Sequence, residues 1–225
     1  MRRAGYVAGV TDTRHEYDAL AGLYVPIGAA VVLLVALLVV AFAWRYRARP
    51  ADDGARRPSR VHSAPRTEGL WVLVLACVAA LLLWRTYTVE GRTDHAASGR
   101  GLRVLVTASK WHWRFDYPRL RIVQRGTDDT PPTLVVPARR TIDFTLRSLD
   151  VIHAFWIPDR RFKRDATPGF VSSFSLVFPR TGFWRYGGEC SEYCGLRHTW
   201  MKFHVDVLSP AAFARWTRTR QGGAA

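Results

Sequence analysis

The sequence has few of the residues that staple small domains or attach haem covalently. Only three of its 225 residues are cysteine and only two are methionine. Three cysteines exclude a domain held together by several disulfides. The motif C-x-x-C-H does not occur, so we expect no fused c-type haem domain in this chain.

Negative charge and lysine are also scarce. Eighteen acidic residues stand against 33 basic ones, of which 30 are arginine, and the formal net charge is +15. This balance excludes an acidic tail protein and is typical of chains that meet nucleic acid, anionic membranes or acidic partners. Because no nucleic-acid-binding motif accompanies the arginines, we expect no nucleic-acid partner.

Two long hydrophobic runs occupy much of the first 88 residues. Residues 23–44 carry no charge over 22 positions, and residues 69–84 form a shorter run of 16. A helix needs about 20 apolar residues to cross the bilayer core, and tilt or snorkelling of Arg85 would accommodate the shorter run. A signal peptide is the alternative for the first run and a buried soluble helix for the second. The first run is too long for a typical signal peptide and no small-residue cleavage site follows it, so we expect two retained spans in membrane lipid.

The distribution of arginine predicts the orientation of these spans. Residues 45–68 contain seven arginines and three acidic residues, whereas the arginines before the first run are balanced by acids. Cytoplasmic loops carry the excess of positive charge. We therefore expect an extracytoplasmic segment at residues 1–22, a transmembrane hairpin at 23–88 with its loop in the cytoplasm, and a C-terminal domain on the outer face.

From residue 89 the sequence predicts an all-β domain. Short stretches of β-branched and aromatic residues alternate with proline and glycine turn signals, which is typical of an antiparallel β-sandwich or barrel. Ser209 and Pro210 suit the cap and first position of a helix, which predicts a C-terminal helix through residue 218 in a segment 209–225. The eight predicted strands of the domain, residues 89–208, cover 102–107, 111–117, 133–136, 141–147, 151–157, 170–178, 183–186 and 200–207.

Residue types that bind soft metals are concentrated near the C-terminus. Cys190 and Cys194 are four positions apart, His198 follows four later and Met201 three after that. Two thiolates, an imidazole and a thioether suit copper rather than magnesium or calcium. A mononuclear blue-copper site needs only one cysteine, so the second cysteine favours two metals bridged by two thiolates.

Other interpretations of this cluster stay open from the residues alone. The two cysteines could form a disulfide in an oxidising compartment. A zinc site is a second alternative, although zinc seldom recruits methionine and usually has C-x-x-C spacing. Plain packing is a third. A further imidazole is needed from elsewhere, and His153 at the end of a predicted strand is the best candidate, with His112 and His204 as rivals.

At this point the sequence shows a resemblance to a known family. Residues 190–201, C-S-E-Y-C-G-L-R-H-T-W-M, resemble the CuA-binding loop of cytochrome c oxidase subunit II, whose pattern is C-S-E-x-C-G-x-x-H-x-x-M. Residues 150–153 and 163–169 resemble the upstream ligand strand and turn of that family. The resemblance covers about residues 15–217 and implies a membrane-anchored all-β architecture. Two N-terminal transmembrane helices would be followed by a cupredoxin-like Greek-key β-sandwich.

The resemblance implies a dinuclear copper centre, CuA. Cys190 and Cys194 would bridge the two copper ions, His153 and His198 would be terminal ligands, and Met201 would be a weak axial ligand. Two coppers that share two thiolates spread one electron over the pair, so bond lengths change little on reduction. Contacts around the ligands would then tune the potential.

Further roles follow from the resemblance. The carbonyl of Glu192 would be the other axial ligand, and its side chain would reach a magnesium or manganese ion shared with subunit I. Trp111 matches the tryptophan through which the family receives electrons, although Lys110 replaces the usual glutamine. Glu68 in E-G-L-W resembles the mouth of a proton path in the neighbouring subunit, although the threonine and proline of that pattern are absent.

The function implied is that of subunit II of a haem–copper respiratory terminal oxidase in a bacterial plasma membrane. It would accept electrons from a cytochrome c donor and pass them to haem in subunit I for O2 reduction, with subunits I and III as partners. The alternatives are a CuA subunit of a related nitric oxide reductase and a membrane-anchored copper chaperone. Residues 89–225 contain 22 basic and 12 acidic residues, a net +10, so we expect a donor that is tethered or not strongly basic.

Overall fold

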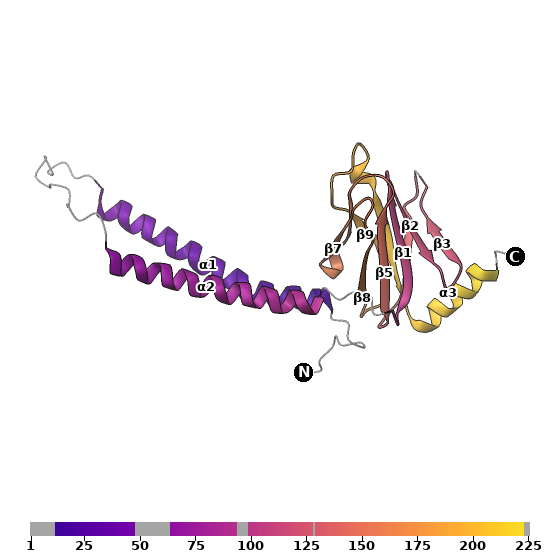
Figure 1. Cartoon of the computed structure of the whole chain (residues 1–225), viewed down its shortest axis with the longest axis horizontal. Coiled ribbons are helices and arrows are strands. Elements are labelled where there is room, and N and C mark those ends of the chain that lie inside the picture. Colours follow the sequence, from indigo (N-terminus) through magenta and orange to yellow (C-terminus); the bar gives the residue numbers. More distant parts are fainter. Residues whose placement is uncertain (1–11, 48–63, 94–98, 128, 223–225) are drawn as a thin grey trace, which may run out of the picture. The chain divides into compact units, whose positions relative to one another are not determined.

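The computed structural model describes residues 12–47, 64–93, 99–127 and 129–222. The chain divides into two compact units, one of residues 18–89 and one of residues 90–225 together with 1–17. The first is helical and the second is built mainly of strands (Figure 1). Each unit is described by itself below.

The helical unit contains two long apolar helices. Helix α1 (Thr13–Arg45) begins just before this unit, and α2 (Pro65–Thr93) follows it; their 33 and 29 residues correspond to about 50 and 44 Å. Both are long and apolar enough to cross a membrane. The apolar stretch of each helix is not buried within the protein, whereas the core helix of a soluble protein would be mostly buried. Tyr24 on α1 donates its hydroxyl to the carbonyl of Leu82 on α2 at 3.0 Å. The two predicted apolar helices are confirmed, whereas most of the arginine-rich loop, at 48–63, lies outside the described residues.

The second unit contains a two-sheet sandwich. Its strands are β1 (Leu102–Ser109), β2 (His112–Tyr117), β3 (Ile122–Arg125), β4 (Thr133–Pro137), β5 (Thr141–Ser148), β6 (His153–Ile157), β7 (Phe162–Ala166), β8 (Ser172–Val177), β9 (Gly182–Cys190) and β10 (Lys202–Leu208). One sheet has the order β3-β2-β1-β5-β8 and the other β4-β10-β9-β6-β7. Short 3-10 helices lie at Pro158–Arg160 (η1) and His198–Trp200 (η2).

The sheets differ from the antiparallel arrangement expected from the sequence. The pairs β1–β5 and β4–β10 are parallel, whereas the other neighbours are antiparallel. A parallel pair requires a crossover between strands that are distant in sequence. Turn signals between consecutive strands do not report such pairing. The predicted β-sandwich is confirmed, with two parallel pairs that the antiparallel expectation did not include.

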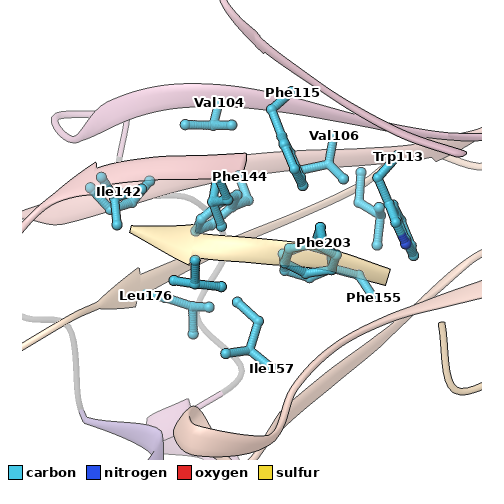
Figure 2. Packing of buried hydrophobic residues seen from close by; sticks show 14 of the residues in the cluster. Val104, Val106, Trp113, Phe115, Ile142, Phe144, Phe155, Ile157, Leu176 and Phe203 are labelled. Atoms are coloured by element: carbon cyan, nitrogen blue, oxygen red, sulfur yellow. The ribbon is translucent and has the colours of Figure 1, made fainter. Parts of the chain in front are cut away.

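The core of the sandwich is aromatic and lies directly behind the predicted metal ligands. Along β2, Trp113, Phe115 and Tyr117 are buried on alternate positions. Phe155 of β6 stacks on Phe203 of β10 at 5.1 Å between ring centroids, and Trp113 meets both rings edge-on (Figure 2). Trp113 and Phe115 therefore both belong to the core. Rigid rings at this density leave little room for the adjoining strand ends to move.

The C-terminal helix α3 (Pro210–Gly222) begins as predicted and runs four residues further. The hydroxyl of Ser209 accepts a hydrogen bond from the amide of Ala212 at 3.2 Å, which caps the helix N-terminus. Phe213 is buried against the sandwich. The helix therefore closes one edge of the core.

Candidate metal centre

Three chain segments bring the predicted ligands to one end of the sandwich. Strand β9 ends at Cys190, and the loop that follows includes η2 and returns to β10. The amide of Cys190 donates to the carbonyl of Met201 at 2.9 Å, which closes this loop at its base. Strand β6 begins at His153 and pairs with β9, where Phe155 lies opposite Cys190. The pairing of β6 with β9 therefore places His153 beside the thiols, although it is distant from them in the sequence.

The sulfur and imidazole donors form a compact cluster. The Sγ atoms of Cys190 and Cys194 are 3.8 Å apart. His153 Nδ1 lies 3.8 Å from the first thiol, and His198 Nδ1 lies 3.6 Å from the second. Met201 Sδ is 3.9 Å from Cys194 Sγ. The structure thus brings together all five side chains that the sequence assigned to the copper centre.

This donor set fits soft metal ions better than the alternatives. Two donors about 2.3 Å from one tetrahedral ion are about 3.8 Å apart, which is close to the spacings found here. A disulfide would require an S–S distance of about 2.05 Å, and both cysteines are free thiols. His153, Cys190 and Cys194 are buried and place their ligand atoms within 4.8 Å of one another. Thiolate, imidazole and thioether donors together favour copper.

A carboxylate orients the imidazole of His153. Asp150 Oδ1 lies 2.8 Å from Nε2 of His153, which turns Nδ1 toward the Cys190 thiol. Asp150 is held in turn by the amides of Lys110 and Val151 at 2.6 and 2.7 Å. Partial burial raises the pKa of Asp150, but its hydrogen bonds to His153 and to these amides outweigh it and lower the pKa. Histidines that bind a metal through one ring nitrogen commonly contact a carboxylate through the other.

The two thiols differ in acidity. Burial raises the pKa of Cys190, but hydrogen bonds with His153 and with the backbone outweigh it, so its pKa is lowered. Burial and the neighbouring Cys190 thiolate together raise the pKa of Cys194. Ionisation of one thiol therefore opposes ionisation of the other, and a metal cation that binds both thiolates would offset this repulsion.

Glu192 presents different groups in two directions. Its backbone carbonyl accepts a hydrogen bond from the Cys190 thiol at 3.2 Å. Its carboxylate is 45% exposed and lies 3.9 Å from Nζ of Lys163. The carbonyl thus belongs to the cluster and the side chain faces outward.

Trp111 connects the cluster to the surface. Its indole Nε1 donates to the carbonyl of Cys194 at 3.2 Å. Gly195 beside this ring has φ of +113°, a backbone conformation that L side chains rarely adopt, so the turn of the loop here favours glycine. A groove of about 920 Å³ opens beside Trp111, and Leu196 and Trp200 of the metal loop are among its lining residues.

The remaining predicted residues lie elsewhere. His204 accepts a hydrogen bond from the amide of Tyr186 at 3.0 Å, and His112 lines the groove, so neither rival histidine joins the thiols. Glu68 accepts the amide of Ala64 at 2.9 Å at the start of α2, which is a helix-capping contact. Its predicted role in a proton path is not tested by this contact.

Two supporting contacts were not anticipated from the sequence. Asp150 is only the first residue of the 150–153 motif in the sequence, yet it orients His153. Trp113 packs in the core, and its indole also donates to the carbonyl of Met201 at 3.2 Å. A carboxylate three residues before a candidate ligand was the available signal for the first contact. No local signal predicts the second, because it joins segments 88 residues apart.

Comparisons with known proteins agree with this site. Residues 102–208 match the family of the cytochrome c oxidase subunit II periplasmic domain. A probable cytochrome c oxidase subunit 2 from Rickettsia bellii is 26% identical over 214 residues, covering 88% of this chain and 77% of that protein. One from Mycobacterium leprae is 36% identical over 139 residues, covering 60% of this chain and 38% of that protein.

A solved structure is similar as well. The crystal structure of the periplasmic domain of cytochrome oxidase subunit II from Bradyrhizobium japonicum superposes with a TM-score of 0.50 at 28% identity. The match covers 58% of this chain and 99% of that one. Residues 102–208 therefore form a domain of the family of the cytochrome c oxidase subunit II periplasmic domain, and the chain is similar to a subunit 2 protein over 88% of its length.

Proposed function

We propose that this chain is the electron-entry subunit of a haem–copper respiratory oxidase. The observation that carries the proposal is the cluster of two thiols, two imidazoles and a thioether, in which successive donors lie 3.6 to 3.9 Å apart. Two apolar helices would anchor the chain in a bacterial plasma membrane, with the β domain on the outer face.

The residues of the cluster would hold two copper ions. Cys190 and Cys194 would bridge them, and His153 and His198 would each bind one. Met201 and the carbonyl of Glu192 would complete the site as weak ligands. When bound, a copper pair of this kind takes up and releases a single electron.

The protein's part in this function is to keep the ligands still. The carbonyl of Met201 accepts from both the Cys190 amide and the Trp113 indole, so the metal loop is tied to the aromatic core. Asp150 fixes the ring of His153. Ligands that hardly move on oxidation or reduction lower the energy needed to reorganise the site, which favours rapid electron transfer.

Electrons would enter on the side of Trp111. This ring is partly buried against the metal loop and is hydrogen-bonded to the backbone of a bridging cysteine. Tyr193, Leu196 and Trp200 expose 77%, 88% and 78% of their surface on the same loop. A cluster of exposed large apolar side chains marks a binding surface. A cytochrome-type donor would dock there.

The exit would face subunit I across a second apolar surface. Ser148 and Pro168 form a β-bridge that joins the loops on either side of the β6–β7 hairpin. These loops expose Leu149, Phe170 and Val171 by 64%, 62% and 58%. His153 follows the first of these loops, so this surface adjoins a copper ligand. The outward carboxylate of Glu192 would bind a magnesium or manganese ion shared with subunit I, and subunit III would complete the complex.

Glu68 is proposed as the mouth of a proton path in subunit I. The support for this role is its position at the start of α2 and the family pattern around it. The turnover of a complex that carries Glu68→Ala tests this role. Unchanged turnover would contradict it.

A matched pair of cysteine variants tests the proposed function. In the purified oxidase complex, Cys194→Ser should reduce cytochrome-driven oxygen consumption to background while the haem content stays unchanged. Cys77→Ser changes the remaining cysteine of the chain, which lies in α2, and this variant should retain full oxygen consumption. Retained oxygen consumption in the Cys194→Ser complex would contradict the proposal.

A further inference from the structure

The end of the β-sandwich opposite the metal cluster is rich in arginine. The cluster occupies the end where β1 ends and β6 begins. The β2–β3, β4–β5 and β8–β9 turns form the other end, because β2 and β8 run antiparallel to β1 and β5, and α3 begins there after β10, which runs parallel to β4. These turns and α3 contain no acidic residue, and they expose eight arginines: Arg119, Arg121, Arg139, Arg140, Arg180, Arg215, Arg218 and Arg220.

Hydrogen bonds join the three turns and α3 into one surface. The amide of Arg139 donates to the carbonyl of Phe178 at 2.8 Å, which links the β4–β5 and β8–β9 turns. The β4–β5 turn also bonds to the last residue of β10, just before α3 begins. Near the other end of α3, the side-chain amide of Gln221 donates to the carbonyl of Leu120 in the β2–β3 turn at 2.8 Å. Helix α3 therefore reaches from the end of β10 to the β2–β3 turn (Figure 1), and we call the surface that carries the eight arginines the arginine face.

The arginines of this face are not neutralised within the protein. Among the residues that the structure describes, none of the eight has an ion-pair partner. The one side-chain hydrogen bond among them is weak, from Nε of Arg139 to the carbonyl of Pro179 at 3.4 Å. Eight like charges at one end of a domain repel each other, so an anionic partner would relieve this repulsion.

The carboxylates on the adjoining strands do not offset this charge. Asp143 is buried and accepts hydrogen bonds from the hydroxyl of Ser175 and the amide of Gly101 at 2.6 and 2.7 Å. Asp116 is paired with Arg114 at 2.6 Å. Asp206, near the end of β10, is partly buried. The exposed charge at this end is therefore strongly positive.

The arginine face also lies where the chain enters the β domain. The first strand after α2 is β1, which begins at this end, and only eight residues separate Thr93 at the end of α2 from Leu102. Because α2 is long and apolar enough to cross a membrane, this short segment limits how far the arginine face can lie from a bilayer. A short tether raises the effective concentration of the surface that it holds near its target.

We propose that the arginine face binds the anionic phospholipid headgroups of the membrane in which the chain is anchored. A guanidinium group binds phosphate oxygens through two parallel hydrogen bonds, and clustered basic side chains are attracted to anionic lipid surfaces. The contact would fix the β domain against the outer face of the bilayer. This inference goes beyond electron entry and does not depend on the metal cluster.

Hydrogen–deuterium exchange of the full-length chain in lipid nanodiscs tests the proposal. One set of nanodiscs contains phosphatidylcholine alone, and the other contains about 30% phosphatidylglycerol. In the anionic nanodiscs, the backbone amides of the three turns and of α3 should exchange about fivefold more slowly at low salt. This protection should disappear at about 500 mM salt, because salt screens the attraction. The loop that carries the metal ligands should exchange equally in both nanodiscs.

Charge variants locate the contact. A triple variant with Arg140→Glu, Arg180→Glu and Arg218→Glu should lose the protection in anionic nanodiscs. The matched variant with lysine at the same three positions keeps the charge and should retain most of it. Arg140→Glu alone should weaken the protection, whereas Lys110→Glu makes the same change of charge at the metal end and should leave it unchanged.

Several outcomes would overturn the proposal. Equal exchange in neutral and anionic nanodiscs, or protection that persists in the triple glutamate variant, would show that the arginine face does not bind anionic lipid. The same protection produced in neutral nanodiscs by inorganic phosphate would assign the face to a soluble anion. Protection that appears in neutral nanodiscs only with the complete oxidase complex would assign it to a protein partner. The copper content is measured separately, so none of these outcomes bears on the electron-entry function.

Discussion

The indole N–H of Trp111 donates a hydrogen bond to the main-chain carbonyl of Cys194, with 3.2 Å between the two atoms. This contact joins the β1–β2 turn to the metal loop without any charged side chain. Trp111 lines the open groove and also contacts the backbone of a proposed copper ligand. An electron that reaches the ring is therefore one hydrogen bond from the metal loop.

Trp111→Phe should slow electron entry while leaving the copper centre intact. The variant keeps an aromatic ring but loses the N–H that fixes the ring against Cys194. We expect donor oxidation to fall about ten- to hundredfold, because a small displacement of a reacting group costs rate of that order. Stopped-flow oxidation of the reduced donor measures the effect. Trp216→Phe, in α3, serves as the control. A wild-type rate in the Trp111 variant would refute this role.

Asp150→Asn should weaken copper binding. The neutral amide can no longer hold Nε2 of His153 as a carboxylate does, so the ring loses its orienting charge. Loss of such a contact typically lowers metal affinity about ten- to hundredfold. Competition with a copper chelator measures the affinity. Asp165→Asn removes a carboxylate that lies 3.8 Å from Nζ of Lys163 and should change the affinity little. Equal affinities in the two variants would argue against the orienting role.

Gly188→Ala should destabilise the domain and disturb the site. A Cβ at this position would lie 1.9 Å from Cζ of Phe203, which is itself stacked on Phe155. Overpacking of a filled core costs about 1–3 kcal/mol. Urea unfolding of the purified chain measures the loss, and its copper content should fall as well, since Cys190 is two residues away. Gly222→Ala, where nothing lies within 4 Å of a Cβ, should show neither change.

Stability should fall above pH 10 because of Tyr117. Burial raises the pKa of this phenol above its ordinary value of 10.0, more than its contacts with the backbone of Val135 lower it. Between the unfolded and the folded pKa, the unfolded chain has lost a proton that the folded chain keeps, so unfolding becomes easier as pH rises. The slope from this residue is about 1.4 kcal/mol per pH unit.

Tyr117→Phe isolates that contribution. The variant lacks both hydrogen bonds to Val135 and should be less stable than the wild type at pH 8. Its disadvantage should shrink as pH is raised from 9 to 11, because it has no phenol to ionise. Denaturant unfolding at each pH measures the difference. A constant difference over this range would contradict the assignment.

Much of the site could be predicted from the sequence because its ligands are local. Four of them lie within twelve residues: Cys190, Cys194, His198 and Met201. Any fold that forms this loop therefore keeps them close together. His153 required the family resemblance, since its approach depends on the pairing of β6 with β9. The contacts of Trp111 and Trp113 with the metal loop depend on how distant segments meet, and no local pattern reports this.

The strands that sequence analysis missed are the ones with the weakest apolar pattern. β3 (Ile122–Arg125) and β7 (Phe162–Ala166) are each an outer strand of its sheet. Edge strands are commonly short and charged, which blocks pairing with other chains. β7, with the sequence F-K-R-D-A, has three charged residues in the middle of five. Hydrophobic periodicity therefore overlooks these two outer strands, although it detects the more apolar outer strands β4 and β8.

The charge of the domain shows a different limit of sequence analysis. The net +10 suggested a cationic surface facing the donor. The structure places arginine-rich turns at the opposite end and internally paired carboxylates near the metal cluster. A total charge carries no information on where in the fold the charges lie.

The central claim is that this chain holds two copper ions in one electronically shared centre. It is tested most directly by measuring the copper content and the electron paramagnetic resonance spectrum of the full-length chain, purified in detergent and loaded with copper. We predict two coppers per chain and a hyperfine pattern from one unpaired electron shared equally by two copper nuclei. A single bound copper, no copper, or hyperfine structure from one nucleus alone would contradict the account.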